Sequence, residues 1–119
     1  MKRFLLMSLA AAVLAGCGPT PPQAPLPDAK KLDESTGDIS SACGGAYQLS
    51  AFGGDHRKDL ITLEATASSA AYKLAGVYHR NPAWIYQGET IGQIVSDADS
   101  MLGACGLPQA QSALRRATR

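Results

Sequence analysis

Apolar residues recur every three or four positions over residues 56–80, and this is the clearest helical pattern in the chain. The recurring positions lie along one face of a helix: Leu60, Leu63, Ala67, Ala70, Leu74 and Val77. Asp55 stands where a carboxylate would cap the first turn. His79 and Arg80 place positive charge at the other end, and Pro82 follows as a stop. The pattern predicts a helix over residues 56–80.

A second pattern predicts a helix over residues 82–104. Asn81 is a candidate N-cap, and Pro82 suits the first helical position because its missing N–H would be unpaired there in any case. Gly88 and Gly92 weaken the first turns, since glycine in a helix interior costs up to about 1 kcal/mol relative to alanine. The apolar positions on one face are Trp84, Ile91, Ile94, Ala98, Met101 and Cys105. Two long helices are therefore expected to meet at a tight corner.

Weaker patterns predict one helix before this pair and one after it. The first covers residues 37–52, with Gly44–Gly45 weakening its middle, and the last runs from Pro108 to Leu114. Beyond Asp38 no polar and apolar residues alternate over the length of a strand, and alanine is abundant. We expect an all-α fold, a small bundle of three to four helices over residues 37–119.

The start of the chain has a different organisation. Lys2 and Arg3 precede an apolar run, residues 4–15, which is too short to cross roughly 30 Å of hydrocarbon. Leu14-Ala15-Gly16-Cys17 ends this run and resembles the lipobox of bacterial lipoproteins. The resemblance implies that residues 1–16 are a signal peptide and that Cys17 carries the lipid, including palmitate, that anchors the protein in a membrane. The alternative is an ordinary secretory signal with a cysteine there by chance.

The residues after Cys17 indicate the membrane in which the protein is anchored and the kind of segment that joins the anchor to the domain. By resemblance to lipoprotein sorting in Gram-negative bacteria, Gly18 lacks the aspartate that retains such proteins at the inner membrane, which implies the outer membrane, facing the periplasm. In a Gram-positive cell this inference would not apply. Residues 18–27, GPTPPQAPLP, favour polyproline II, which spans about 3.1 Å per residue. We expect residues 17–36 to be a tether; a proline-rich ligand for a partner is the alternative.

Two cysteines remain for disulfide bonding once Cys17 is lipidated. Cys43 and Cys105 both fall on apolar helix faces in a compartment that favours oxidation, so a bond between them is expected. Parallel first and third helices would, however, hold them roughly 20 Å apart along the bundle at 1.5 Å per residue, whereas a disulfide needs α-carbons within about 7 Å. Either the first helix crosses obliquely, breaking at Gly44–Gly45, or one cysteine bonds a partner protein.

Charge and composition exclude some partners. Removal of Lys2 and Arg3 with the signal leaves nine basic residues against ten acidic ones, a net charge of about minus one. This balance gives no indication of nucleic-acid binding. The remaining chain is long enough for one small domain.

No group of residues has the spacing of a catalytic or metal centre. His56 and His79 stand at opposite ends of one predicted helix, about 35 Å apart at 1.5 Å per residue. Asp97 and Asp99 are two residues apart on a helix and point in different directions. We therefore expect no enzyme activity, no metal and no cofactor.

Aromatic residues gather around the predicted corner between the two long helices: Tyr72, Tyr78, Trp84 and Tyr86. Such residues most often pack a corner. Where they are partly exposed they make strong anchors for a partner, because tryptophan and tyrosine dominate interface energies. Tyr78, Trp84 and Tyr86 are therefore the candidate partner-binding residues.

The anchor, tether and small helical domain together favour a non-enzymatic envelope lipoprotein that binds another periplasmic or outer-membrane protein. It would act as an accessory subunit of a secretion or conjugation assembly. The alternative is a periplasmic immunity protein or an inhibitor of a toxin or a peptidoglycan hydrolase. The two differ in outcome: an accessory subunit copurifies with a large assembly, whereas an inhibitor forms a tight one-to-one complex.

Overall fold

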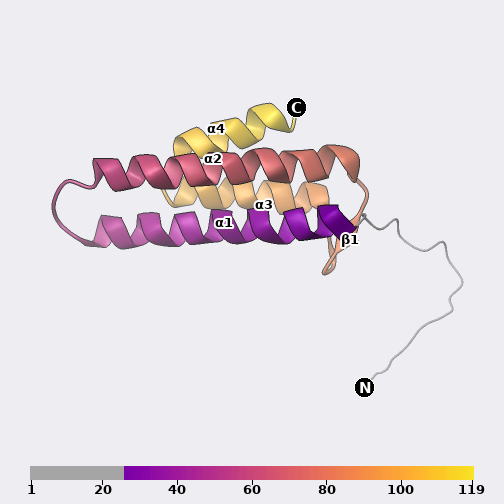
Figure 1. Ribbon diagram of the computed structural model, residues 1–119, viewed down its shortest axis with the longest axis horizontal. Helices are drawn as coiled ribbons and strands as arrows, with labels where there is room; N and C mark the ends of the chain where they lie inside the picture. Colours follow the sequence, from indigo (N-terminus) through magenta and orange to yellow (C-terminus); the bar gives the residue numbers. More distant parts are fainter. Residues whose placement is uncertain (1–25) are drawn as a thin grey trace, which may run out of the picture.

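A computed structural model describes residues 26–119, which form four helices and one short β-hairpin (Figure 1). The predicted all-α bundle is confirmed. The predicted signal peptide, the lipidation site Cys17 and the tether up to residue 25 lie outside the described residues. The elements in chain order are α1 Leu26–Ala51, α2 Arg57–Arg80, β1 Ile85–Tyr86, β2 Glu89–Thr90, α3 Ile91–Ala104 and α4 Pro108–Ala117.

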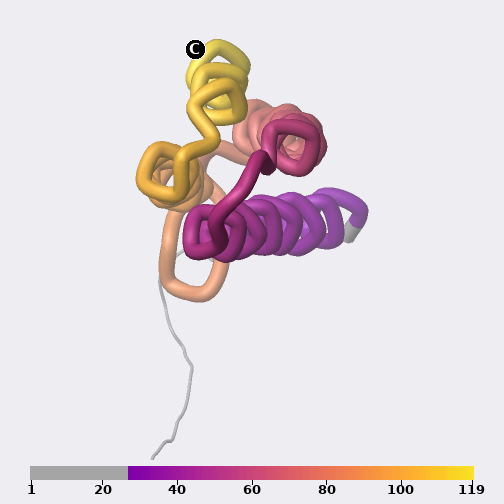
Figure 2. Tube along the Cα trace, turned by 90° about the vertical axis from the view of Figure 1, so that its left-hand side faces the viewer, coloured from indigo at the N-terminus to yellow at the C-terminus, as the bar shows by residue number. Residues whose placement is uncertain are grey.

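The helices alternate in direction: α1 and α3 run one way along the bundle and α2 and α4 the other (Figure 1). Viewed from one end, α2 and α3 are seen nearly along their axes, while α1 lies inclined to them (Figure 2). Side chains from all four helices and from the α3–α4 connection meet in one core. Its largest fully buried apolar members are Leu32, Ile39, Leu74, Val77, Ile91, Leu102, Leu107 and Leu114.

Helix α1 begins at Leu26, eleven residues before the predicted start, so the prediction that residues 26–36 belong to a tether is wrong. The inner face of this extension is half polar. Leu32 and Ile39 are buried seven residues apart, but Asp28 and Ser35 hold the alternating inward positions. The Ser35 hydroxyl donates to the Leu32 carbonyl at 3.1 Å, which satisfies it within the helix. A pattern search that counts only apolar residues misses such a face.

Residues 82–90 form a hairpin rather than the predicted start of a helix. Gln87 and Gly88 both have positive φ, 50° and 84°, as the central residues of tight hairpin turns do. Strands β1 and β2 pair antiparallel across this turn. The N-cap of α3 is Thr90, whose side chain and Gln93 form a reciprocal capping box. Asn81, predicted as the N-cap, instead ends α2.

The ends of the other helices agree only in part with their sequence signals. The Asp55 carboxylate accepts the backbone N–H of Arg57 at 3.1 Å, but it is not the N-cap of α2, because that position belongs to His56, which makes no side-chain capping hydrogen bond. Helix α2 ends at Arg80, before the proline. Helix α4 begins at Pro108 as predicted and continues to Ala117, three residues beyond the predicted end.

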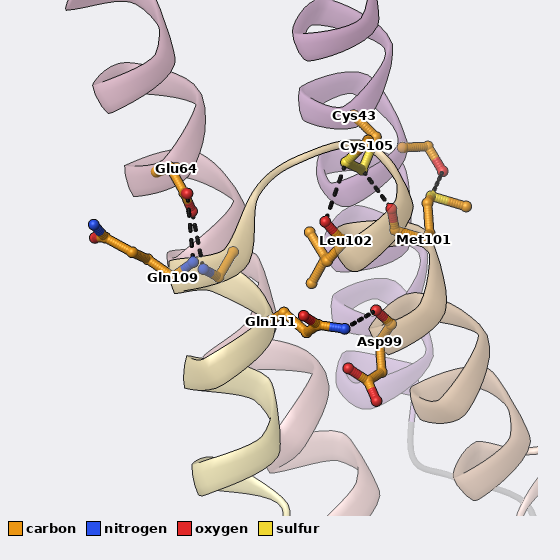
Figure 3. The surroundings of a disulfide bond; sticks show 10 residues. Cys43, Glu64, Asp99, Met101, Leu102, Cys105, Gln109 and Gln111 are labelled. Atoms are coloured by element: carbon orange, nitrogen blue, oxygen red, sulfur yellow. Dashed lines mark hydrogen bonds between the residues drawn. A yellow bond between two sulfur atoms is a disulfide. The ribbon is translucent and has the colours of Figure 1, made fainter. Parts of the chain in front are cut away.

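The predicted disulfide is present: Cys43 on α1 is bonded to Cys105, and their α-carbons are 5.3 Å apart (Figure 3). The two cysteines are not separated along the bundle, because α1 begins earlier and α3 begins later than predicted. Cys43 stands seventeen residues after the start of α1, and Cys105 fourteen residues after the start of α3, so the two reach similar heights. Helix α1 is inclined but does not break at Gly44–Gly45. Both cysteines are buried.

We predict that this bond supplies a large share of the stability of the domain. The loop it closes spans 62 residues, so the chain-entropy relation gives about 4 kcal/mol of unfolding free energy. Replacing both cysteines, Cys43→Ala with Cys105→Ala, should lower the free energy of unfolding by about that amount in urea denaturation. The matched control is the wild type with reductant, which should move toward the double variant, whereas the double variant should not respond. Equal stability of all four samples would contradict the prediction.

Candidate functional site

The structure brings Trp84 and Tyr86 together at the hairpin, and Tyr78 of α2 packs against the same core. The ring centroids of Trp84 and Tyr86 are 5.4 Å apart. Trp84 is only 7% exposed and belongs to the core. The half-buried Tyr86 donates its hydroxyl proton to the Asp33 carboxylate of α1, and this negative acceptor raises the pKa of Tyr86. Tyr78 is half-buried and packs against the same core.

These contacts show that the aromatic residues at this end mainly pack the core. Trp84 fills the space between hairpin and helices, and Tyr86 holds the hairpin to α1. A partner-binding role of Tyr78, Trp84 and Tyr86 stays a prediction, and of the three only the two tyrosines retain part of their surface. Tyr72 lies apart from them on α2 and is 55% exposed.

A charged clasp closes the same end of the bundle. Arg80 donates through Nε and an Nη to the two oxygens of Asp28, at 3.0 and 2.8 Å, and Asn81 donates its side-chain amide to the same carboxylate at 2.7 Å. These donors lower the pKa of Asp28 to about 2, the Arg80 hydrogen bonds contributing most. The clasp fastens the first turn of α1, where residues 1–25 join the domain, to the last turn of α2.

The titratable residues singled out in the sequence are held apart. His56 contacts the carbonyls of Phe52 and Gly53, while His79 contacts the carbonyl of Ala117 at the other end of α2. Within residues 26–119 no three histidine, cysteine or carboxylate side chains are grouped so as to hold a metal.

The two aspartates of α3 also face different neighbours. Asp99 pairs with Arg115 at 3.0 Å. Asp97 lies near Glu89 and raises the pKa of that carboxyl by its negative charge. The structure therefore confirms that Asp97 and Asp99 do not form a pair.

The opposite end of the bundle has apolar side chains that remain exposed to solvent. None of residues 47–66, which we call the distal tip, is buried. In Figure 1 the ends of α1 and α2 at this tip extend past α3 and α4, so two helices and their loop project without the other pair beside them. Phe52 is 67% exposed and Ile61 is 68% exposed. Apolar side chains this open, both at one end of a small domain, are typical of an interaction surface.

Two hollows flank the distal tip. One, of about 490 Å³, lies between the end of α1, the α1–α2 loop and the α3–α4 turn, and includes Phe52 and Cys105. The other, of about 480 Å³, lies between the first half of α2 and the start of α4, and includes Ile61 and Gln109. Both are lined by Leu60, a half-buried apolar residue on the rim of the core.

Two charged groups of the tip, Arg57 and Glu64, already have partners within the domain. Arg57 is paired with Asp55 at 2.6 Å. The Glu64 carboxylate reaches across to α4 and accepts the backbone N–H groups of Gln109 and Ala110, at 3.4 and 2.9 Å (Figure 3). These N–H groups belong to the first turn of α4, which lacks partners inside the helix. The surface that remains for a ligand at the tip is therefore mainly apolar.

The sequence did not single out this surface. Ile61 lies off the apolar face of its helix, and a single exposed apolar residue carries no signal. The apolar spacing over residues 37–52 predicts Phe52 on the inner face of that helix, but α1 ends at Ala51 and leaves Phe52 in the loop. The run Phe52-Gly53-Gly54 was the available signal, because a pair of glycines marks the end of a helix and leaves the residue beside it outside the helical pattern.

Comparisons with models of protein families, with curated proteins and with solved structures found no significant match. Among the helices of residues 26–119, none combines the length and the apolar character that a membrane span requires.

We predict that the clasp makes stability depend on acid pH. The pKa of Asp28 is lowered in the folded state, so its contribution is complete above its ordinary pKa of 3.8 and is lost as the pH falls toward about 2. Asp28→Asn should lower the melting temperature at pH 7 and flatten its decline between pH 4 and pH 2. Thermal unfolding followed by circular dichroism measures both effects.

The matched control is Asp55→Asn, since Asp55 also pairs with an arginine but at a more exposed site. Its effect on the melting temperature should be smaller. An unchanged pH profile in Asp28→Asn would contradict the role of the clasp.

Proposed function

We propose that this chain is a non-enzymatic envelope lipoprotein, anchored in the outer membrane through Cys17 and facing the periplasm. Its helical domain binds another periplasmic or outer-membrane protein, as an accessory subunit of a secretion or conjugation assembly. The signal and lipidation parts of the proposal rest on residues 2–17, where a basic start, an apolar run and small residues lead to the cysteine.

The observation that carries the binding part is the placement of the exposed apolar surface. The chain from Cys17 enters the domain at Leu26, and the distal tip lies at the other end of α1. A helix of 26 residues is about 39 Å long, so the tip stands that far from the point of entry. An anchored domain of this shape holds its apolar end away from the bilayer, within reach of a partner.

The chemistry of the tip supports binding over catalysis. Its two most exposed large apolar residues are Phe52 and Ile61, and Arg57, which is paired with Asp55, lines both hollows beside them. Exposed apolar side chains beside a charge that is already paired suit contact with another protein surface.

Lipidation can be tested with Cys17→Ser in the full chain. The wild type should incorporate radiolabelled palmitate in its native cells and sediment with outer membranes, whereas the variant should incorporate none and lose the membrane association. Label retained in the variant, or absent from the wild type, would contradict anchoring at Cys17.

Partner binding can be tested by substitutions at the tip. Phe52→Asp and Ile61→Asp should each abolish copurification of the partner after reversible crosslinking. Because both side chains are more than two-thirds exposed, the free energy of unfolding should change by no more than about 0.5 kcal/mol. Ser41→Asp, at an exposed position of α1 outside the distal tip, is the matched control and should retain the partner.

The copurified material distinguishes the proposal from its alternative. A large envelope assembly supports an accessory subunit. A one-to-one complex with a toxin or a peptidoglycan hydrolase would assign the chain as an immunity protein or inhibitor instead. A monomer free of any partner under all conditions would refute both.

A further inference from the structure

One face of α2 is largely exposed to solvent from Ile61 to Tyr72. Ile61, Ala65, Ser68 and Tyr72 follow one another at steps of four, three and four, so they form one strip along the helix. Ile61 is 68% exposed and Tyr72 is 55% exposed. We call these four residues the α2 strip. Its first three members line the 480 Å³ hollow between α2 and α4.

The two charged side chains of this hollow do not leave a site for a small ion. Arg57 is engaged by Asp55, and the Glu64 carboxylate is held by the first turn of α4. The hollow therefore presents the side of α2 that carries Leu60, Ile61 and Ala65, and the start of α4 forms its wall. The ligand that matches this shape is elongated and apolar on one side.

The borders of the α2 strip are basic. Lys58 and Lys73 lie on α2 along the side of the strip that faces away from α4, and Arg116 lies on α4 on the other side. None of the three takes part in an ion pair of residues 26–119, and residues 1–25 contain no acidic residue. Around the axis of α2, Lys58 and Lys73 lie about 60° and 120° from Ile61 and Asp59 lies about 160° from it, so the two lysines are nearer to the strip than the aspartate. An acidic ligand complements this border.

The bundle itself indicates that the ligand is a helix. From Ala67 onward, neighbouring helices bury one side of α2, including Ala70, Leu74 and Val77, but none of residues 57–66 at its start is buried. The α2 strip lies on a side of the helix that no helix of residues 26–119 covers, so a partner helix lying along it would pack on α2 as α1 and α4 do on its other sides. Amphipathic helices bind such grooves through apolar residues at i, i+3, i+4 and i+7.

Two other occupants fit less well. Two copies facing each other through the α2 strip would bring the basic borders together, and like charges destabilise such a contact. A membrane surface is flat whereas the hollow is concave, and three cations contribute only about 1 kcal/mol each to adsorption on anionic lipid. A protein helix with acidic flanks is therefore the occupant that shape and charge favour.

We propose that the α2 strip, with the hollow beside α4, is the docking site for an acidic amphipathic helix of the partner protein. This inference rests on the proposed function, because it names the partner segment that the distal tip receives. The apolar face of that helix covers Ile61, Ala65 and Tyr72, and its carboxylates face Lys58, Lys73 and Arg116.

Site-specific photocrosslinking in native cells tests the contact. The full chain would carry p-benzoylphenylalanine at Ala65 in the strip, at Gln48 on α1, or at Ala83 before the hairpin, all three exposed. We expect crosslinking from Ala65 to be at least about tenfold stronger than from the other two sites. Mass spectrometry should map it to a segment with helical apolar periodicity and acidic flanks.

The outcomes separate this inference from the proposed function. A partner crosslinked only from Gln48 or Ala83 would leave the proposed function standing and overturn the docking site. Crosslinks from Ala65 to lipid, to a second copy of this chain, or to a basic or non-helical segment would also overturn it. No crosslink from any site would refute both proposals.

Charge variants test the basic border. Reversing two charges, Lys58→Glu with Lys73→Glu, should reduce the Ala65 crosslink by about tenfold or more, because each reversal replaces attraction with repulsion. The matched control, Lys58→Arg with Lys73→Arg, keeps the charge and should retain the crosslink. Circular dichroism should give the same helix content for both variants, since the two lysines are exposed. An undiminished crosslink in the reversed variant would overturn the acidic character of the partner helix.

Discussion

The Cys43–Cys105 bond is the constraint on which the arrangement of this domain depends. It fixes the end of α3 against α1 with the α-carbons 5.3 Å apart. Because Cys43 is followed by eight more residues of α1, the helix continues past the point where α3 stops. The same bond that closes the core thus sets the boundary beyond which α1 and α2 project as a bare pair.

The clasp at the other end complements this bond. Asp28 is buried at the start of α1 and is satisfied by three donors from Arg80 and Asn81. A buried carboxylate without such partners would be strongly unfavourable, so the clasp also selects the register of α1 on α2. One covalent and one charged fastening, each near one end of the core, hold four helices that share a small apolar interior.

The two ends therefore have different roles. The hairpin, the clasp and Trp84 close the end where residues 1–25 join, and Trp84, Tyr78 and Tyr86 pack against the core there. The distal tip leaves Phe52 and Ile61 in solvent, while Arg57 and Glu64 are engaged within the domain. This division supports a module that is fixed at one end and binds at the other.

The sequence by itself determined the helical class and the start of α4 at Pro108, because these depend on local chemistry, and it predicted the bond between Cys43 and Cys105. It did not determine where α1 and α3 begin. Asp28 and Ser35 make the inner face of α1 polar. Burial of Asp28 is favourable because Arg80 pairs with it, and burial of Ser35 is favourable because its hydroxyl donates to the Leu32 carbonyl. Gln87–Gly88 turns the chain because a hairpin packs Trp84 into the core. The exposed tip, too, was decided by tertiary structure alone, since it depends on where α3 and α4 end in space.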